Sequence, residues 1–199
     1  MPQRPLEDRR AVGRQTSHDV GAPLAAPSSS DPPLTAPALV RDATLADIPA
    51  LLDVINPAYK RADGFIFPHG TRTDADELRE LIEDSSSRLL VAEIDGEVAG
   101  SIQLDIDGDR AHFGPLATSI AHQQRGVAST LIAAAEDIAR AAGCATLRIE
   151  AIGEVGWVPY YEKRGYTVVA QIPSDRWPGS ERWGGVRPWT MVEMKKDLP

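Results

Sequence analysis

The spacing of apolar residues along this chain predicts an ordered series of strands and helices. A short apolar segment at 39–41 predicts the first strand. Thr44, followed three positions later by Asp47, is typical of a helix N-cap. The apolar face of the helix that follows consists of Ile48, Leu51, Leu52 and Ile55.

Turn signals divide the next part of the chain. A second helix is expected to open near Thr73, because several acidic residues follow it and favour the first turn of a helix. Asp95-Gly96 lies between apolar segments at 89–94 and 98–104, which predicts a β-hairpin. Asp107-Gly108 predicts another turn, ahead of a strand that ends at Thr118.

A third helix is predicted over residues 127–142, where apolar side chains recur at helical spacing and Gly143 follows as a C-cap. Its other face carries Glu136, Asp137 and Arg140. The alternating segment 145–151 predicts the next strand. Strand, loop, helix and strand make a crossover unit, which is expected to be parallel and right-handed.

These elements define the fold class as α/β (α+β), with a mixed sheet that is antiparallel first and parallel across the crossover. Helices are expected on both faces of this sheet. No internal repeat is visible in the sequence.

Residues 1–37 differ from the rest of the chain, being rich in Pro, Ala and Ser and without periodicity. Such a composition buries too little apolar surface to offset the entropy of ordering, so we expect a disordered tail followed by one domain at 38–199. The arginines of this segment leave a transit peptide open as an alternative, although its acidic residues fit that class poorly. A mis-assigned start codon is a third interpretation.

Composition limits the classes of function. The chain of 199 residues has 42% apolar residues and a net charge of −8, which argues against a nucleic-acid-binding surface. Its single cysteine, Cys144, offers neither a disulfide framework nor zinc-ligand spacing, and we expect no metal. No apolar run reaches membrane-spanning length. We expect a cytoplasmic protein with no membrane partner, either a monomer or a homodimer.

The loop before the third helix has the layout of a phosphate-binding site. Main-chain N–H groups at a helix N-terminus lack partners within the helix and lie at the positive end of its dipole. Gly126 in this loop allows an anion to approach the main chain closely, and Ala128 is the next smallest residue. The sequence of the loop is Gln123-Gln124-Arg125-Gly126-Val127-Ala128.

This loop, the run Gly114-Pro115-Leu116-Ala117-Thr118 and the run Tyr160-Tyr161-Glu162-Lys163-Arg164-Gly165-Tyr166 together resemble the GNAT superfamily of N-acetyltransferases. The resemblance covers about residues 38 to 197 and is strongest from 89 to 166. It implies an acyl-CoA N-acyltransferase fold with a splayed central sheet. It also implies that acetyl-CoA is the acetyl donor, bound by Leu116, Ala117, Thr118, Gln123, Gln124, Arg125, Gly126, Val127, Ala128 and Ser129.

Gly114-Pro115 predicts an interruption of the sheet, since Pro removes an N–H group from the ladder and Gly permits a bulge. Main-chain groups of Leu116 and Thr118 would then be free. By resemblance, the Leu116 amide would face the thioester carbonyl of the donor.

Acetyl transfer to an amine needs an acid for the departing thiolate and a base for the amine. Tyr161 is the candidate acid, because a phenol with a reference pKa near ~10 stays protonated at neutral pH. It also matches the recurring tyrosine of the family. For the base, two residues remain open: His112, whose strand position corresponds by resemblance to a catalytic Glu, and Glu150, acting through water. The family also uses water chains without a dedicated base.

The acceptor site is less determined. Where the family often has an Asn, this chain has Gly153-Glu154-Val155-Gly156-Trp157, so contacts of that loop with the donor are in doubt. A Trp-rich segment near the C-terminus could cover the acceptor pocket or form a dimer interface. The candidate pocket residues are Phe65, Phe67, His69, Trp177 and Trp183.

The sequence therefore favours an acetyl-CoA-dependent N-acetyltransferase that acts on the amine of a small molecule, by direct attack in a ternary complex. No Cys or Ser is placed for a covalent intermediate. Two alternatives stay open: a protein lysine or N-terminal acetyltransferase, and a non-catalytic CoA-binding regulatory module.

Overall fold

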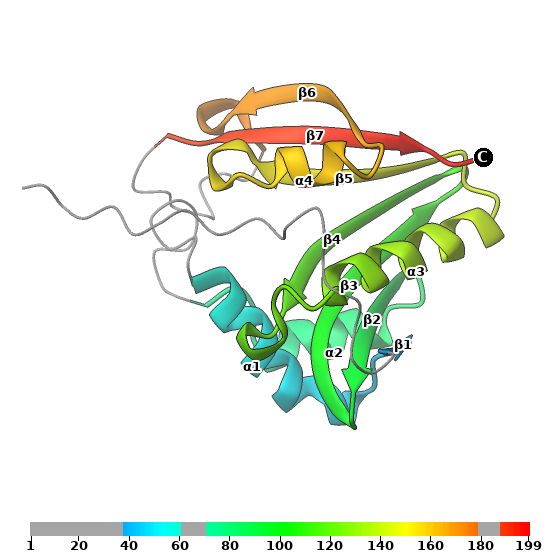
Figure 1. Ribbon diagram of the computed structural model, residues 1–199, viewed down its shortest axis with the longest axis vertical. Coiled ribbons are helices and arrows are strands. Elements are labelled where there is room, and N and C mark those ends of the chain that lie inside the picture. The colour runs from blue at the N-terminus through cyan, green and yellow to red at the C-terminus, as the bar shows by residue number, and fades with distance from the viewer. Residues whose placement is uncertain (1–37, 61–70, 179–187) are drawn as a thin grey trace, which may run out of the picture.

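Seven strands form one sheet in the computed structural model, which describes residues 38–60, 71–178 and 188–199 (Figure 1). The strands lie in the order β1-β2-β3-β4-β5-β7-β6. Only β4 and β5 run parallel, and every other neighbouring pair is antiparallel. The predicted mixed sheet is confirmed.

The first four strands form a meander: β1 (Leu39–Asp42), β2 (Ser87–Ile94), β3 (Glu97–Asp107) and β4 (Arg110–Thr118). Both predicted turns are present. Asp95 and Gly96 have φ values of 53° and 84°, as a two-residue turn with left-handed central residues requires. Gly108 has a φ of 58° in the next turn.

The remaining strands are β5 (Thr146–Ile152), β6 (Thr167–Pro173) and β7 (Thr190–Asp197). The last strand of the chain, β7, lies between the other two and is antiparallel to both. This half of the sheet therefore depends on a strand that comes from the C-terminus.

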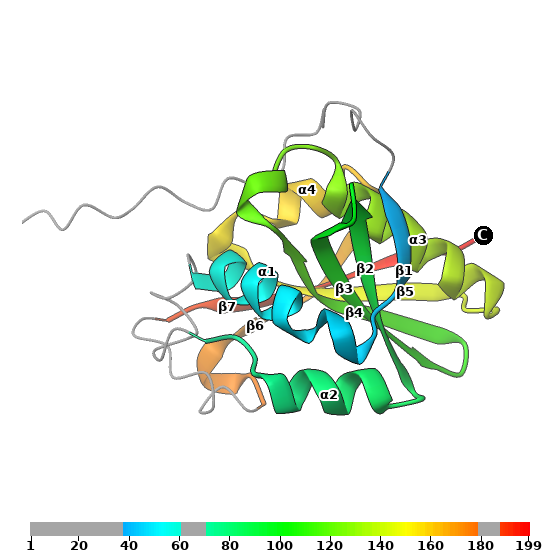
Figure 2. The same cartoon turned by 90° about the horizontal axis from the view of Figure 1, so that it is seen from below.

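Helices cover both faces of the sheet, as predicted (Figure 2). α1 (Ile48–Lys60) and α2 (Ala75–Glu83) pack on one face, over β2, β3 and β4. α3 (Val127–Ala141) packs on the other face, and α4 (Val158–Glu162) contributes Tyr160 and Tyr161 to the same core. Short 3₁₀ turns occupy Leu45–Asp47, Ile120–His122, Gly153–Val155 and Ser174–Arg176. None of the helices in the described residues is long and apolar enough to cross a membrane.

The start of α1 differs slightly from the prediction. Thr44 and Asp47 do form a capping box, but they cap a 3₁₀ turn that leads into α1. The Asp47 carboxylate accepts hydrogen bonds from the Thr44 amide at 2.7 Å and from the Arg41 guanidinium at 2.8 and 2.9 Å. The cap thereby joins β1 to α1. In α2 the N-cap is Asp74 rather than Thr73.

Glu136, on the polar face of α3, is buried. Its carboxylate accepts hydrogen bonds from the Tyr166 hydroxyl at 3.0 Å and from the Lys196 ammonium at 2.8 Å. Arg140 lies 3.3 Å from the same carboxylate. Lys196 of β7 and Tyr166, the residue before β6, thus cover this side of α3 with groups that pair with a carboxylate.

The sheet separates between its two parallel strands. β4 and β5 pair only where Arg110–His112 faces Thr146–Arg148. Beyond this point the two strands diverge, as Figure 1 shows. We call the stretch beyond His112, where the main chains of β4 and β5 no longer pair, the β4–β5 opening.

Candidate active site

The β4–β5 opening begins at a bulge in β4. On the β3 side, Ile102 pairs with Leu116 and Leu104 with Phe113, so Gly114 and Pro115 together face the single residue Gln103. Gly114 has a φ of 142°, a conformation that side chains other than glycine rarely adopt. The bulge bends β4 away from β5, as the Gly-Pro pair predicted.

Main-chain groups of β4 beyond the bulge face this opening. The Ser119 amide donates to the Ala99 carbonyl at 2.9 Å, so Ser119 points its main-chain groups toward β3. Since these groups alternate along a strand, those of Leu116 and Thr118 point the other way. They have no partner on β5, which pairs with β4 no further than His112. The prediction that these groups are free fails for the Leu116 carbonyl, which accepts a hydrogen bond from the Tyr59 hydroxyl.

Tyr59, from the end of α1, borders the opening. Its hydroxyl donates to the Leu116 carbonyl at 3.3 Å, and the Arg72 guanidinium lies 5.7 Å from the centre of its ring. Asn56 holds this region together, because its amide oxygen accepts from the Arg72 and Thr73 amides at 2.8 and 3.1 Å. Sequence reasoning missed these residues, since no local pattern links Tyr59 with a strand 57 positions away.

The loop before α3 presents unpaired amides, as predicted. Gln124 and Gly126 have φ values of 60° and 83°. The Thr130 amide donates to the Gly126 carbonyl at 3.0 Å. The amides of Val127 and Ala128 precede that bond, and no side chain caps the helix. No acidic residue stands in its first turn, so an anion meets no repulsion there.

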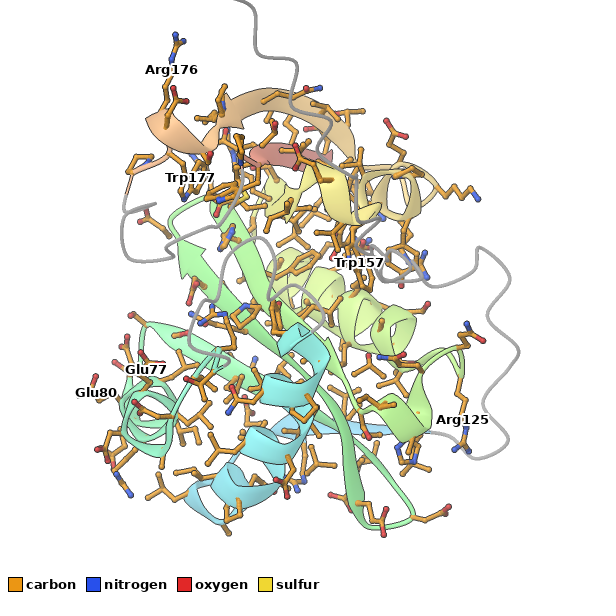
Figure 3. The ribbon with its side chains drawn as sticks, turned by 90° about the vertical axis from the view of Figure 1, so that its left-hand side faces the viewer. Glu77, Glu80, Arg125, Trp157, Arg176 and Trp177 are labelled. Carbon is orange, nitrogen blue, oxygen red and sulfur yellow. The ribbon has the colours of Figure 1, made fainter. Side chains whose placement is uncertain are left out.

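Besides Arg125 in the loop itself, Arg164 from the other half of the molecule reaches the start of α3. Arg164, which follows α4, lies 3.7 Å above the ring of Tyr160 and donates a hydrogen bond to the Ser129 hydroxyl. The predicted Arg125 lies in the loop itself and points outward (Figure 3). Positive charge therefore comes to the start of α3 from two segments. The loop sequence predicts Arg125 but not Arg164.

Tyr161 lies in the core beneath the opening and is 7% exposed. Its ring packs against those of Phe113, Tyr160, Tyr166 and Trp157, with centroids 5.4 to 6.3 Å apart. Within the described part of the chain, the Tyr161 hydroxyl has no hydrogen-bond partner. Burial raises the pKa of Tyr161 well above its ordinary value, and the phenols of Tyr59 and Tyr160 add to this effect.

His112 stands at the apex of the opening, in the last residue pair that joins β4 to β5. Its Nδ1 atom lies 3.8 Å from the Asp105 carboxylate on β3. Its Nε2 atom is buried and has no hydrogen-bond partner in the described residues. Partial burial raises the pKa of Asp105, but contacts with His112, Ser87 and Gln103 lower it further, so that the net shift is downward.

Glu150 is two residues along β5 from the partner of His112, and its side chain is exposed. It faces Glu193 across the β5–β7 pair. Loss of hydration raises the pKa of Glu150; the His112 ring opposes this shift and Glu193 adds to it. The two predicted base candidates thus flank the same opening.

Of the residues predicted to line an acceptor pocket, the structure describes only Trp177. It packs, together with Trp157, against an apolar cluster at the end of β5 and the start of β7, and Figure 3 labels both rings. That cluster consists of Ile152, Val155, Trp189 and Met191. Phe65, Phe67, His69 and Trp183 lie outside the described residues.

Comparison with known proteins agrees with this geometry. The model of the acetyltransferase (GNAT) family matches residues 49–166. The chain therefore belongs to the GNAT family.

Solved structures share its fold. Ribosomal-protein-alanine N-acetyltransferase from Brucella melitensis has a TM-score of 0.66 and 22% identity, covering 80% of this chain and 99% of that one. A Salmonella typhimurium protein whose structure holds acetyl-CoA has a TM-score of 0.62 and 22% identity, and the match covers 82% of this chain and 95% of that one. N-acetylglutamate synthase from Neisseria gonorrhoeae, in complex with coenzyme A and N-acetyl-glutamate, has a TM-score of 0.59 and 22% identity. The match covers 82% of this chain and 36% of that one. The named acceptors of these proteins differ, while their fold is shared.

Proposed function

We propose that this protein is an acetyl-CoA-dependent N-acetyltransferase that acetylates the amine of a small molecule by direct attack in a ternary complex. Two main-chain features carry the proposal: the amides of Val127 and Ala128 that open α3, and the stretch of β4 from Leu116 onward that has no partner on β5. Membership of the GNAT family supports it. The single free cysteine suits a reducing compartment such as the cytoplasm.

The residues at the start of α3 fit a diphosphate. The amides of Val127, Ala128 and Ser129 would donate to its oxygens, and Gly126 leaves room for close approach. Gln123, Gln124 and Arg125 would border the same group, and Arg164 would add charge. The donor supplies an activated acetyl group when bound, and the β4–β5 opening would receive its extended arm along Leu116, Ala117 and Thr118.

The main chain of β4 would stabilise the transition state. The Leu116 amide points into the opening and would donate to the carbonyl oxygen of the thioester as negative charge develops there. A donor fixed in a strand needs no reorganisation during the reaction. The hydrogen bond from Tyr59 to the Leu116 carbonyl would hold this peptide group in place.

Tyr161 would act as the acid and His112 as the base. The raised pKa of Tyr161 keeps its hydroxyl protonated, and the phenol would donate to the sulfur as the thiolate departs. His112 is favoured over Glu150 because its Nε2 atom is unpartnered at the apex, whereas Glu150 extends from the exposed side of β5. These two unpartnered groups favour an enzyme over a non-catalytic CoA-binding module.

A small-molecule acceptor is favoured by the aromatic residues near the end of β5. Trp157 and Trp177 border an apolar cluster there, and such surfaces are typical of small-molecule pockets. Phe65, Phe67, His69 and Trp183 stay candidates for the same pocket. A protein lysine or N-terminal acetyltransferase would need to admit a peptide past these rings.

The experiment that tests this function is thiol release from acetyl-CoA in the presence of small amines, amino acids and peptides. We expect turnover with a small amine and a hydrolysis background without one. Turnover with peptides alone would replace the proposed acceptor class. Donor binding without turnover on any acceptor would favour the non-catalytic module.

A further inference from the structure

A carboxylate that no feature of the sequence singled out lies beside His112. Asp105 faces His112 directly across the β3–β4 pair. Its side chain is fixed by other donors: the Ser87 hydroxyl donates to it at 2.6 Å, and the Gln103 amide nitrogen lies 3.1 Å from each of its oxygens. Three neighbouring strands thus contribute to one polar cluster.

The orientation of the His112 ring follows from this cluster. Nδ1 is the ring nitrogen on the carboxylate side, 3.8 Å from Asp105, which is an ion-pair distance rather than a hydrogen bond. Cε1 lies 3.9 Å from the place that a Cβ atom on Gly114 would occupy, so the ring lies against the bulge. Nε2 is buried without a partner in the described residues. A buried nitrogen of this kind needs an explanation, and a catalytic role is one.

The other charged groups around His112 come from β5 and β7. Arg148 pairs with His112 on β5, Glu150 lies two residues further on, and Glu193 faces Glu150 from β7. Both side chains on β5 are exposed. Among these groups, the Asp105 carboxylate is the one within ion-pair distance of the ring.

We infer that Asp105, held by Ser87 and Gln103, is a positioning residue that fixes the His112 ring so that Nε2 serves as the base toward the acceptor amine. The inference rests on the proposed function. A negative charge at the Nδ1 side favours the tautomer that carries its proton on Nδ1, which leaves the lone pair on Nε2. The same charge stabilises the imidazolium that forms when Nε2 takes a proton.

The step balances without a further reactant. A bond forms between the acceptor nitrogen and the acetyl carbon, and the bond from that carbon to sulfur breaks. The nitrogen loses one proton to Nε2 of His112, and the departing sulfur gains one from Tyr161. Water then returns both side chains to their starting protonation.

The test compares Asp105→Asn with Asp107→Asn, a change of the same kind two residues along the same strand. For D105N we expect kcat to fall about tenfold, a fraction of what a general base contributes, with an unchanged KM for acetyl-CoA. D107N should leave the rate as in the unchanged protein.

A double-mutant cycle separates this role from a structural one. If Asp105 acts through His112, adding D105N to His112→Gln should cause no further loss of kcat. A further tenfold loss in the double variant, at equal thermal stability, would overturn the inference.

An NMR measurement makes the inference distinguishable from the proposed function. In ¹⁵N-labelled protein, the ring nitrogens of His112, assigned with H112Q, should show the Nδ1–H tautomer, and D105N should lose this preference. An unchanged tautomer in D105N, in a protein that transfers acetyl groups, would sink the inference alone. A protein that binds no acetyl-CoA and transfers no acetyl group would sink the proposed function, whatever the tautomer.

Discussion

Tyr161 is the residue on which the proposed chemistry depends most. The residue is 7% exposed, and burial raises the pKa of its phenol, so it remains protonated as pH rises through its ordinary value near ~10. We expect Tyr161→Phe to lower kcat by about 100-fold, as loss of a general acid does, with little change in KM for acetyl-CoA. Steady-state thiol release measures both constants.

Tyr166→Phe is the matched control for this variant. The Tyr166 hydroxyl donates to Glu136 in the core and has no place in the proposed mechanism. Its removal should lower stability and leave kcat unchanged. Equal turnover in Y161F and the unchanged protein would contradict the acid assignment.

Residue roles were predictable only where a local motif carries them. Gly126, Gly114-Pro115 and Tyr161 belong to short motifs, and the geometry expected of the first two is present. Asp105 belongs to no motif, since a lone acid on a strand is common. The turn at Asp107-Gly108 could have revealed its place beside His112. Extending that hairpin pairs Asp107 with Arg110, and therefore Asp105 with His112.

At the scale of elements, the cap that joins β1 to α1 should make stability depend on pH. Hydrogen bonds from Arg41 and Thr44 lower the pKa of Asp47 well below its usual range. Since the folded value lies below the unfolded one, the stabilisation is complete above the unfolded pKa of about 3.9 and is lost as pH falls below it. Asp47→Asn should cost about 1–2 kcal/mol near pH 7, measured by urea unfolding.

The difference in unfolding free energy between Asp47→Asn and the unchanged protein should shrink as the pH falls toward 3. Asp76→Asn is the matched control, because its partner Arg79 is also an arginine but the Asp76 side chain is 89% exposed. Exposed pairs contribute roughly 0–1 kcal/mol, so D76N should unfold almost as the unchanged protein does. A D47N penalty that stays constant down to pH 3 would refute the role of the cap.

At the scale of the whole molecule, α3 connects the two halves of the separated sheet. Glu136 on α3 binds Lys196 of β7 and Tyr166, and its carboxylate is 10% exposed. Glu136→Gln should destabilise the protein by about 2–4 kcal/mol, because it leaves a partly buried ammonium without its counter-charge. Asp137→Asn, next to it but 78% exposed, should cost little.

Thermal unfolding of both variants measures this difference. Equal unfolding temperatures for E136Q and D137N would show that Glu136 does not hold the halves together. This role was not predictable from the sequence, because helical periodicity carries no information on β7, about 60 residues away. The sheet order itself was predicted only as far as the crossover, since the position of β7 between β5 and β6 depends on long-range pairing.

The central claim is that main-chain donors at the start of α3 hold the diphosphate of the acetyl donor. The measurement that tests it most directly is calorimetric titration of coenzyme A into the protein, into Gly126→Glu and into Gly143→Glu. Both glycines have φ values above 80°, so each variant carries a similar backbone cost of roughly 1–2 kcal/mol, at opposite ends of α3. Only the change at Gly126 places a side chain and a negative charge beside the amides of Val127 and Ala128.

The account predicts one bound coenzyme A per chain, an affinity lowered at least about tenfold in G126E by local repulsion, and an affinity unchanged in G143E. A protein that gives no binding heat with coenzyme A at any temperature tried, or a G126E variant that binds it as tightly as the unchanged protein, would contradict the account.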